Sequence, residues 1–279
     1  MPSRLERKAK LHFVHKTSAV ELYTRTAKHA WQQVCQLPKE VLQQFGYIPD
    51  ARRSGVGFEV KTNGSSYDHK LDMHVTLESL PALVAMADVV DTSGTFRSFI
   101  ACAENLLVAL KPLGINYAKR VEGWLGLRSL VDEVSASHKT WMLRFLYYPP
   151  GLPAGDILAQ AHTDKGGYTV HILDEHGSLE FLESTNPSVW KSMQEMKNQA
   201  IVIPGIGLQD LTDSSLRAVA HKVTATEDSF LQGRIAAVCF VDFLSRRHFD
   251  KATYGSQQQQ PVGWNYDCTP EEFSGYFID

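Results

Sequence analysis

The residues best suited to chemistry are two histidines and an aspartate in the second half of the chain. His162-Thr163-Asp164 closes a run of strand-forming residues and precedes the turn Lys165-Gly166-Gly167. Residues i and i+2 of a strand point to the same side, so His162 and Asp164 can converge on one cation. The strand-forming runs that follow allow the chain to return with His221 as a third ligand. Two histidines and one carboxylate on one face of an ion leave three positions open, the arrangement used by oxygen-activating Fe(II) enzymes.

Two further observations bear on this metal hypothesis. The chain holds 11 histidines, so a His-x-Asp triplet can arise by chance. The alternative is a surface turn in which Asp164 hydrogen-bonds the backbone. Thiolates are the usual ligands of structural zinc sites, and no Cys-x-x-Cys pair is present, so the donor set favours Fe(II) over a structural zinc. The four cysteines are Cys35, Cys102, Cys239 and Cys268.

Arg234 opens an apolar strand-forming run, 235–240, that follows His221 in the chain. A buried arginine needs an anionic partner, because an unpaired buried charge is costly. A dicarboxylate cosubstrate would provide that partner through a bidentate guanidinium–carboxylate contact. The alternatives are a protein carboxylate such as Asp228, or an exposed side chain.

The elements that must position these residues change in type along the chain. Helical spacing of apolar residues predicts helices over about 18–45 and 96–110, with a polar, glycine-bearing stretch at 54–72. From Trp141 onward, short strand-forming runs are separated by Gly, Pro and Asp, which predicts an antiparallel barrel or jelly roll. The fold class is therefore α+β, with helices packed on a β-core. The predicted strands cover 142–148, 157–162, 168–173, 179–182, 200–203, 218–223 and 234–243.

We expect one domain over residues 1–279. It divides into a mainly helical part (1–130), a jelly-roll core (141–245) and a C-terminal tail (246–279). The tail carries aromatic residues that could fold over the site as a lid or dock on the core. They include Trp264, Tyr266, Phe273, Tyr276 and Phe277.

Composition narrows the class of partner. The 279 residues are 43% hydrophobic and 21% charged, with a formal net charge of -3. That charge predicts no general attraction to nucleic acid or to anionic membranes. No run of about 18 apolar residues occurs, so we expect no membrane span. Few, widely spaced cysteines favour reduced thiols and a cytoplasmic location. A small-molecule substrate is expected, and nothing indicates an oligomeric state.

The order of these motifs resembles a known family. His-x-Asp, a distal His and an Arg on the following strand resemble the Fe(II)/2-oxoglutarate-dependent dioxygenases, and within them the isopenicillin N synthase-like branch. That branch includes many plant and fungal biosynthetic oxygenases. Residues 143–150, Leu-Arg-Phe-Leu-Tyr-Tyr-Pro-Pro, resemble the family's strand ending in Asn-Tyr-Tyr-Pro-Pro. Residues 203–207 and 209–211 resemble the stretch before the distal histidine, and 37–47 with 68–70 resemble the N-terminal region.

The resemblance implies a double-stranded β-helix, or jelly-roll, core with iron at its open end. It implies that 2-oxoglutarate chelates the iron, that Arg234 binds the distal carboxylate and that Tyr148 helps to position this cosubstrate. Fe(II) is then the cofactor, and O2 the second cosubstrate. The implied reaction is oxidation of an unactivated C–H bond, with hydroxylation, desaturation or oxidative cyclisation as the outcome.

Two positions depart from the family pattern. The family usually has Arg-x-Ser where this chain has Ala236, and Asn where it has Leu146. Each lost hydrogen bond to the cosubstrate is worth about 0.5–1.5 kcal/mol. Arg234 carries the charge, so 2-oxoglutarate binding is still expected. The departures leave room for a substrate-driven iron oxidase of isopenicillin N synthase type. A non-catalytic jelly-roll ligand-binding protein is a further alternative, which the complete ligand set opposes.

Arg144 suggests a class of substrate. Arg144, Leu146 and Tyr148 alternate along one predicted strand and so share one face. If Tyr148 points into the barrel, Arg144 does too. An inward arginine additional to Arg234 favours a carboxylate-bearing substrate, such as an amino acid or a peptide-like acid. The alternative is a structural ion pair within the barrel.

Overall fold

Two antiparallel β-sheets packed against each other form the centre of the protein. The computed structural model describes residues 11–50, 53–61, 70–185, 188–193, 198–245, 247–249 and 277–278. Strands that follow one another from β5 to β8 alternate between the two sheets, and so do β10, β11 and β12. This alternation makes a jelly roll, and the predicted α+β class is confirmed. The larger sheet has the order β1 (His12–His15), β10 (Gln199–Pro204), β7 (Tyr168–Glu175), β12 (Arg234–Val241), β5 (Met142–Tyr148), β4 (Lys70–Val75), β3 (Arg53–Lys61), β2 (Ile48–Asp50), and the smaller has β6 (Ile157–His162), β11 (His221–Ala225), β8 (Gly177–Thr185), β9 (Ser188–Ser192).

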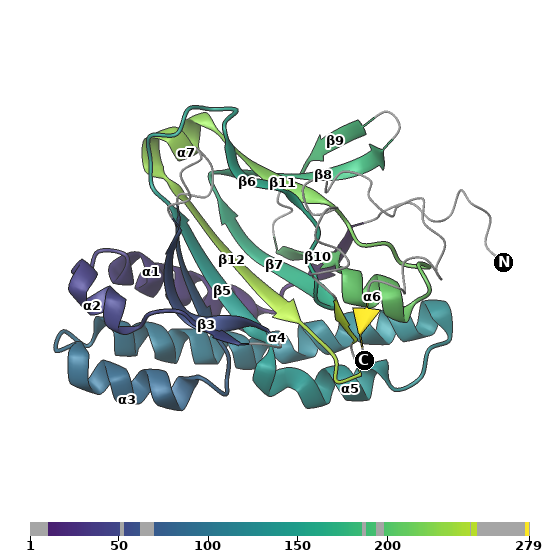
Figure 1. Cartoon of the computed structure of the whole chain (residues 1–279), viewed down its shortest axis with the longest axis horizontal. Helices are drawn as coiled ribbons and strands as arrows, with labels where there is room; N and C mark the ends of the chain where they lie inside the picture. Colours follow the sequence, from purple (N-terminus) through teal and green to yellow (C-terminus); the bar gives the residue numbers. More distant parts are fainter. Residues whose placement is uncertain are drawn as a thin grey trace.

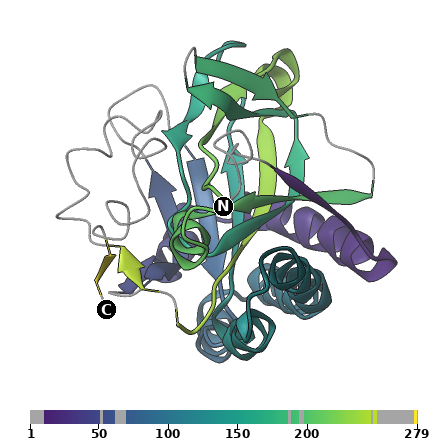
Figure 2. The same ribbon diagram turned by 90° about the vertical axis from the view of Figure 1, so that its right-hand side faces the viewer.

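The helices of the N-terminal half cover the outer face of the larger sheet (Figures 1 and 2). Buried side chains of α1 and α4 form one core with outward-facing strand residues such as Phe145 and Ala237. A second core, between the sheets, contains Ala236 and Val223. The interior of the jelly roll is therefore separate from the helix-packed side. The helices are α1 (Ser18–Val34), α2 (Lys39–Gln44), α3 (Leu80–Val90), α4 (Thr95–Leu125), α5 (Leu130–Ala136), η2 (Ser137–Thr140), α6 (Ile206–Leu211) and α7 (Glu227–Gln232).

Helix α4 is longer than the predicted 96–110. It begins where the Asp91 carboxylate accepts a hydrogen bond from the Phe96 amide at 2.5 Å, and it ends at Gly126 in the left-handed region. It continues through Pro112 because its apolar stripe extends to Tyr117 and Val121, both buried. Its length and composition alone would allow it to cross a membrane, but this stripe packs within the helix-side core.

The part assigned to residues 1–130 also contributes strands that the sequence did not predict. β1, β3 and β4 all join the larger sheet, so the stretch read as polar and glycine-bearing at 54–72 is partly β-structure. In β4, Lys70, Asp72 and His74 alternate with apolar residues and are buried.

Little of the predicted C-terminal tail belongs to the part of the chain that the structure describes. Its strand β14 (Phe277–Ile278) pairs with β13 (His248–Phe249). Trp264, Tyr266, Phe273 and Tyr276, and with them the possible lid, lie outside the described residues.

The loop after β6 is fastened to the start of α6. The amide of Ile206 donates to the Asp164 carbonyl at 2.7 Å, and the amide of Gly207 donates to the Gly166 carbonyl at 2.9 Å. This close approach requires glycine at 205. A Cβ there would lie 2.3 Å from the Gly166 carbonyl oxygen and 3.0 Å from that of Asp164.

Gly205→Ala is therefore expected to push the Asp164–Gly166 loop away from α6. We expect a loss of about 1–3 kcal/mol in the free energy of unfolding, as for other overpacked sites. Chemical denaturation measures this loss. Gly166→Ala is the matched control, because a Cβ at Gly166 meets nothing nearer than the Asp242 carboxylate at 3.9 Å. Equal stability of the two variants would contradict the packing argument.

Candidate metal centre

Two histidines face each other across neighbouring strands of the smaller sheet. His162, the last residue of β6, pairs directly with His221, the first residue of β11. Their ring centroids are 4.4 Å apart. Cross-strand partners project to the same side of a sheet, which explains why the two imidazoles meet. The chain therefore returns with His221 to the end of β6, as the sequence predicted.

Each imidazole has one nitrogen fixed by its own strand. Nδ1 of His162 lies 2.7 Å from the carbonyl oxygen of Gln160, and Nδ1 of His221 lies 3.1 Å from that of Val219. A proton on Nδ1 satisfies these carbonyls and leaves the lone pair of Nε2 for a metal ion. Both histidines are thus held in the tautomer that ligation requires.

Asp164 completes the group. Its Oδ1 is 3.8 Å from Nε2 of His162, and its Oδ2 is 3.8 Å from Nε2 of His221. Thr169 at the start of β7 donates a 2.6 Å hydrogen bond to Oδ2 and so orients the carboxylate. One cation about 2.1 Å from each ligand can bridge atoms up to about 4.2 Å apart. The residues present therefore fit a metal ion, and the surface-turn alternative does not describe this buried carboxylate.

The electrostatics favour the metal-binding protonation state. Burial opposes ionisation of Asp164, but the imidazoles of His221 and His162 and the hydroxyl of Thr169 outweigh it and hold the pKa of this carboxyl below its ordinary value. Although about half of the His162 side chain is exposed, desolvation within the site and then the neighbouring His221 lower the pKa of His162 to about 4. At neutral pH, His162 is a neutral ligand and Asp164 a charged one.

A second group of ligand-type side chains lies on β3 and β4. Glu59, Asp72 and His74 place ligand atoms within 4.8 Å of one another. However, Nε of Arg144 donates to Nε2 of His74 at 2.6 Å. Burial opposes ionisation of Asp72, yet His74, Arg144 and Lys70 hold the pKa of its carboxyl below the ordinary value. Arg144 and Lys70 thus already supply positive charge beside this group, and Nε2 of His74 serves as an acceptor for Arg144.

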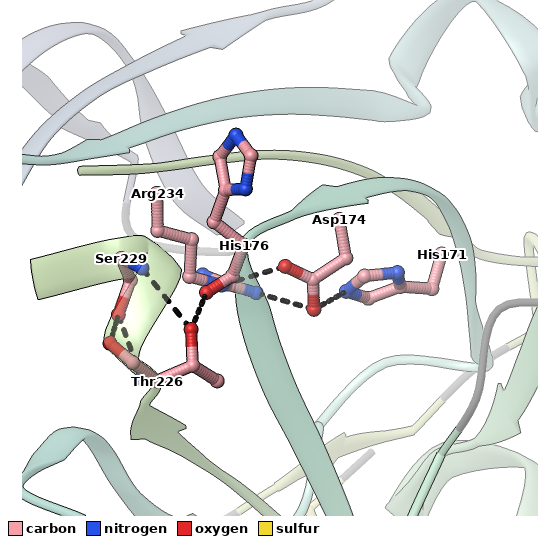
Figure 3. A network of polar contacts seen from close by, with 6 residues as sticks. All are labelled: His171, Asp174, His176, Thr226, Ser229 and Arg234. Atoms are coloured by element: carbon pink, nitrogen blue, oxygen red, sulfur yellow. Dashed lines mark hydrogen bonds and ion pairs between the residues drawn. The ribbon is translucent and has the colours of Figure 1, made fainter. Parts of the chain in front are cut away.

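Arg234 lies in the jelly-roll interior and binds a protein carboxylate. Its Nε donates to Oδ1 of Asp174 at 2.7 Å and its Nη2 to Oδ2 at 3.0 Å (Figure 3). The side chains are only 3% and 6% exposed, so this is a buried bidentate pair. The sequence predicted a carboxylate partner but offered Asp228 as the protein candidate. The observed partner is Asp174, because β7 lies beside β12 and Ala236 pairs with Asp174.

The ends of the strands that carry this pair are fixed by the start of α7. Thr226 caps α7 and donates its hydroxyl to the His176 carbonyl at 2.6 Å, which ties the end of β7 to the turn before β12 (Figure 3). His171 lies three residues before Asp174 in β7, with Nε2 4.0 Å from Oδ2 of Asp174. Burial lowers the pKa of His171 to about 4, so it is neutral at pH 7.

Tyr148 and Arg144 both belong to β5 but reach different parts of the interior. Tyr148 is buried, and the Arg234 guanidinium lies 5.2 Å from its ring centroid. Arg144 is half-buried, with its guanidinium 4.8 Å from the ring centroid of Phe240. Arg144 is also among the groups that lower the pKa of Asp164, so the positive charge of Arg144 acts on the three candidate metal ligands. Arg144 and Tyr148 therefore lie on a common face of β5, as the sequence predicted.

Several residues of the site were not predicted from the sequence. Thr169 and Asp174 come from the predicted strand 168–173 and its end, but their roles depend on neighbours from other strands. The strand that carries Lys70, Asp72 and His74 could have been recognised in the sequence, since polar residues alternate with apolar ones over 70–75. That alternation predicts a strand, although it would place the polar face in solvent.

A jelly roll that brings two histidines and a carboxylate together is typical of mononuclear non-haem iron oxygenases. Comparison with known proteins supports the same class. Residues 140–242 match the model of the 2OG-Fe(II) oxygenase superfamily. The chain is therefore similar to this superfamily over residues 140–242, and the isopenicillin N synthase-like branch is consistent with its features. Members of the superfamily use Fe(II), 2-oxoglutarate and O2.

The relatives are distant and longer. A 2-oxoglutarate-dependent dioxygenase, citB of Monascus ruber, is 27% identical over 142 residues, which cover 49% of this chain and 40% of the relative. Clavatol oxidase claD of Penicillium crustosum is 30% identical over 97 residues, covering 33% of this chain and 28% of the relative. The match thus spans less than half the length of these curated relatives.

Solved structures share the fold. A putative 2OG-Fe(II) oxygenase family protein from Caulobacter crescentus has a TM-score of 0.69 and 20% identity, covering 96% of this chain and 89% of that one. The dioxygenase for auxin oxidation 1 from Arabidopsis thaliana, in its complex with 2-oxoglutarate, has a TM-score of 0.66 and 18% identity, covering 87% and 86%.

Thr169→Val is expected to weaken metal binding without unfolding the protein. The variant keeps the shape of the side chain but removes the hydroxyl that orients the Asp164 carboxylate. Loss of such an outer contact costs about 10–100-fold in metal affinity. Anaerobic titration with Fe(II) measures it. Thr140→Val, which removes a hydroxyl bonded to the Ser137 carbonyl away from the site, is the control. Unchanged affinity in Thr169→Val would contradict this role.

Proposed function

We propose that the protein is an Fe(II)- and 2-oxoglutarate-dependent oxygenase that oxidises an unactivated C–H bond of a small, carboxylate-bearing metabolite. The observation that carries the proposal is the convergence of His162, Asp164 and His221, with both imidazoles held by backbone carbonyls through Nδ1. The oxidation would be a hydroxylation, a desaturation or an oxidative cyclisation, depending on how the substrate is placed.

The chain provides residues for both the metal and the cosubstrate. His162, Asp164 and His221 would hold Fe(II). Arg234, whose guanidinium lies near the ring of Tyr148, would bind the distal carboxylate of 2-oxoglutarate. When bound, iron and 2-oxoglutarate supply the oxidising chemistry with O2, and 2-oxoglutarate leaves as succinate and CO2. The apolar side chains around Ala236 and Val238 exclude water from the interior. The curated relatives named as dioxygenase and oxidase support this reaction class.

Arg144 supports a carboxylate-bearing substrate such as an amino acid or a peptide-like acid. Its guanidinium is held by His74 on one side and by the face of Phe240 on the other, so little conformational freedom remains to be lost on binding. It is half-buried and acts electrostatically on Asp164. A substrate anion bound there would lie beside the metal centre.

A second candidate function follows from the Asp174 contact. If Asp174 kept Arg234 permanently, the chain would lack its main anchor for 2-oxoglutarate, and Leu146 and Ala236 offer no hydrogen bonds in its place. A substrate-driven iron oxidase would then act without this cosubstrate. We favour the 2-oxoglutarate reaction because the superfamily uses it.

Anaerobic titration of the metal-free protein with Fe(II) and then 2-oxoglutarate distinguishes these functions. We expect a saturable visible absorption band from the bidentate chelate, and its loss in His162→Ala. Iron binding without a band would favour the substrate-driven oxidase. If no iron bound at all, both oxygenase assignments would be wrong, and a non-catalytic ligand-binding protein would remain.

Arg144→Gln tests the substrate class. In a screen of amino acids and peptide-like acids, succinate release should rise with acids and not with their amides. For an active acid, Arg144→Gln should raise KM by about tenfold or more through loss of a charged hydrogen bond. Arg97→Gln, at an exposed ion pair with Asp88, is the control. An unaltered KM would exclude Arg144 as the carboxylate anchor.

A further inference from the structure

The contact between Arg234 and Asp174 has the geometry expected of a bound ligand. Two parallel hydrogen bonds of 2.7 and 3.0 Å join the guanidinium to the Asp174 carboxylate, deep in the jelly-roll interior. This is the bidentate arrangement by which arginine recognises any carboxylate. Asp174 therefore makes, within the protein, the contact that the distal carboxylate of 2-oxoglutarate would make.

We propose that Asp174 is an internal competitor for the distal carboxylate of 2-oxoglutarate, and that His171 receives Asp174 when the cosubstrate takes Arg234. This inference rests on the proposed function. It assigns to Asp174 and His171 the control of cosubstrate affinity.

The neighbours of the pair strengthen the competition. Strand register places Asp72, Leu146, Ala236 and Asp174 in one row across β4, β5, β12 and β7. Leu146 and Ala236, at the centre of this row, have no polar side-chain atom to offer a ligand. A carboxylate entering here depends on Arg234, whose charge Asp174 already balances. Two carboxylates beside one guanidinium repel each other strongly where screening is weak.

His171 is placed to relieve this repulsion. It lies in the next row, where Val238 pairs with both His171 and Arg144. Its Nε2 is 4.0 Å from Oδ2 of Asp174, too far for a hydrogen bond but in reach after a small side-chain movement. Its Nδ1 is buried and has no hydrogen-bond partner among the described residues. A neutral imidazole protonated at Nε2 can then donate to the displaced carboxylate.

The two roles predict opposite effects of substitution. Asp174→Asn keeps the size of the side chain and one acceptor for Arg234 but removes the competing charge, so 2-oxoglutarate should bind about tenfold more tightly, because juxtaposed like charges are costly. His171→Leu removes the group that receives Asp174, so 2-oxoglutarate should bind several-fold more weakly. Fe(II) affinity should stay unchanged in both variants.

Calorimetric titration of the anaerobic Fe(II) protein with 2-oxoglutarate makes the measurement. Pyruvate, a 2-oxo acid without a distal carboxylate, is the ligand control and should bind wild type and Asp174→Asn alike. Glu175→Gln is the matched variant, because Glu175 is the next residue of β7 but pairs with Lys28 at 2.6 Å. It should bind 2-oxoglutarate as wild type does.

Two results would overturn the inference. One is equal or weaker binding of 2-oxoglutarate by Asp174→Asn, which would make Asp174 a support that only positions Arg234. The other is unchanged binding by His171→Leu, which decides the question even if Asp174→Asn does not fold. Thermal unfolding checks the fold of each variant. If every protein bound Fe(II) and none bound 2-oxoglutarate, the proposed function would fail, and the inference with it.

Discussion

The antiparallel pairing of β6 with β11 is the constraint on which the site depends. It sets His162 opposite His221 and brings the imidazoles within 4.4 Å of each other. Burial of the Asp164 carboxylate opposes its ionisation, and the two imidazoles, the Thr169 hydroxyl and Arg144 counteract this cost. The loop that carries Asp164 is in turn fixed by backbone hydrogen bonds to α6 through Gly205. A one-residue slip in this pairing would turn the histidines to opposite faces.

The polar interior of the jelly roll follows a second rule, the balance of buried charge. Arg234 is matched by Asp174, and Asp72 is surrounded by His74, Arg144 and Lys70. Each of these groups would be costly if it were buried alone. Because these charges are already paired, an anion entering the interior would have to compete with an existing partner. On our proposal, cosubstrate binding would exchange one carboxylate for another on the inner face of the larger sheet.

Most strands of the core could be predicted because the runs from Met142 to Val241 are short, apolar and separated by turn-forming residues. Helix α4 was placed correctly but cut short, since Pro112 is an ordinary signal for a helix end and only tertiary packing of Tyr117 and Val121 carries the helix past it. Strand β4 was missed because its alternating polar residues resemble a solvated face rather than the inside of a barrel.

From the sequence by itself, His162 and Asp164 could be predicted as a pair of candidate metal ligands, with His221 as the third and with the class of chemistry that such a set supports. A His-x-Asp triplet on a strand is local, so its geometry follows from the two-residue repeat of β-structure. The sequence also predicted that Arg234, if buried, would need an anionic partner. Only the tertiary structure decided which anion, because Asp174 and Arg234 are 60 residues apart in the chain and meet through the lateral order of β7 and β12. Sheet order and register depend on how distant strands pack together, and no local pattern of residues contains that information.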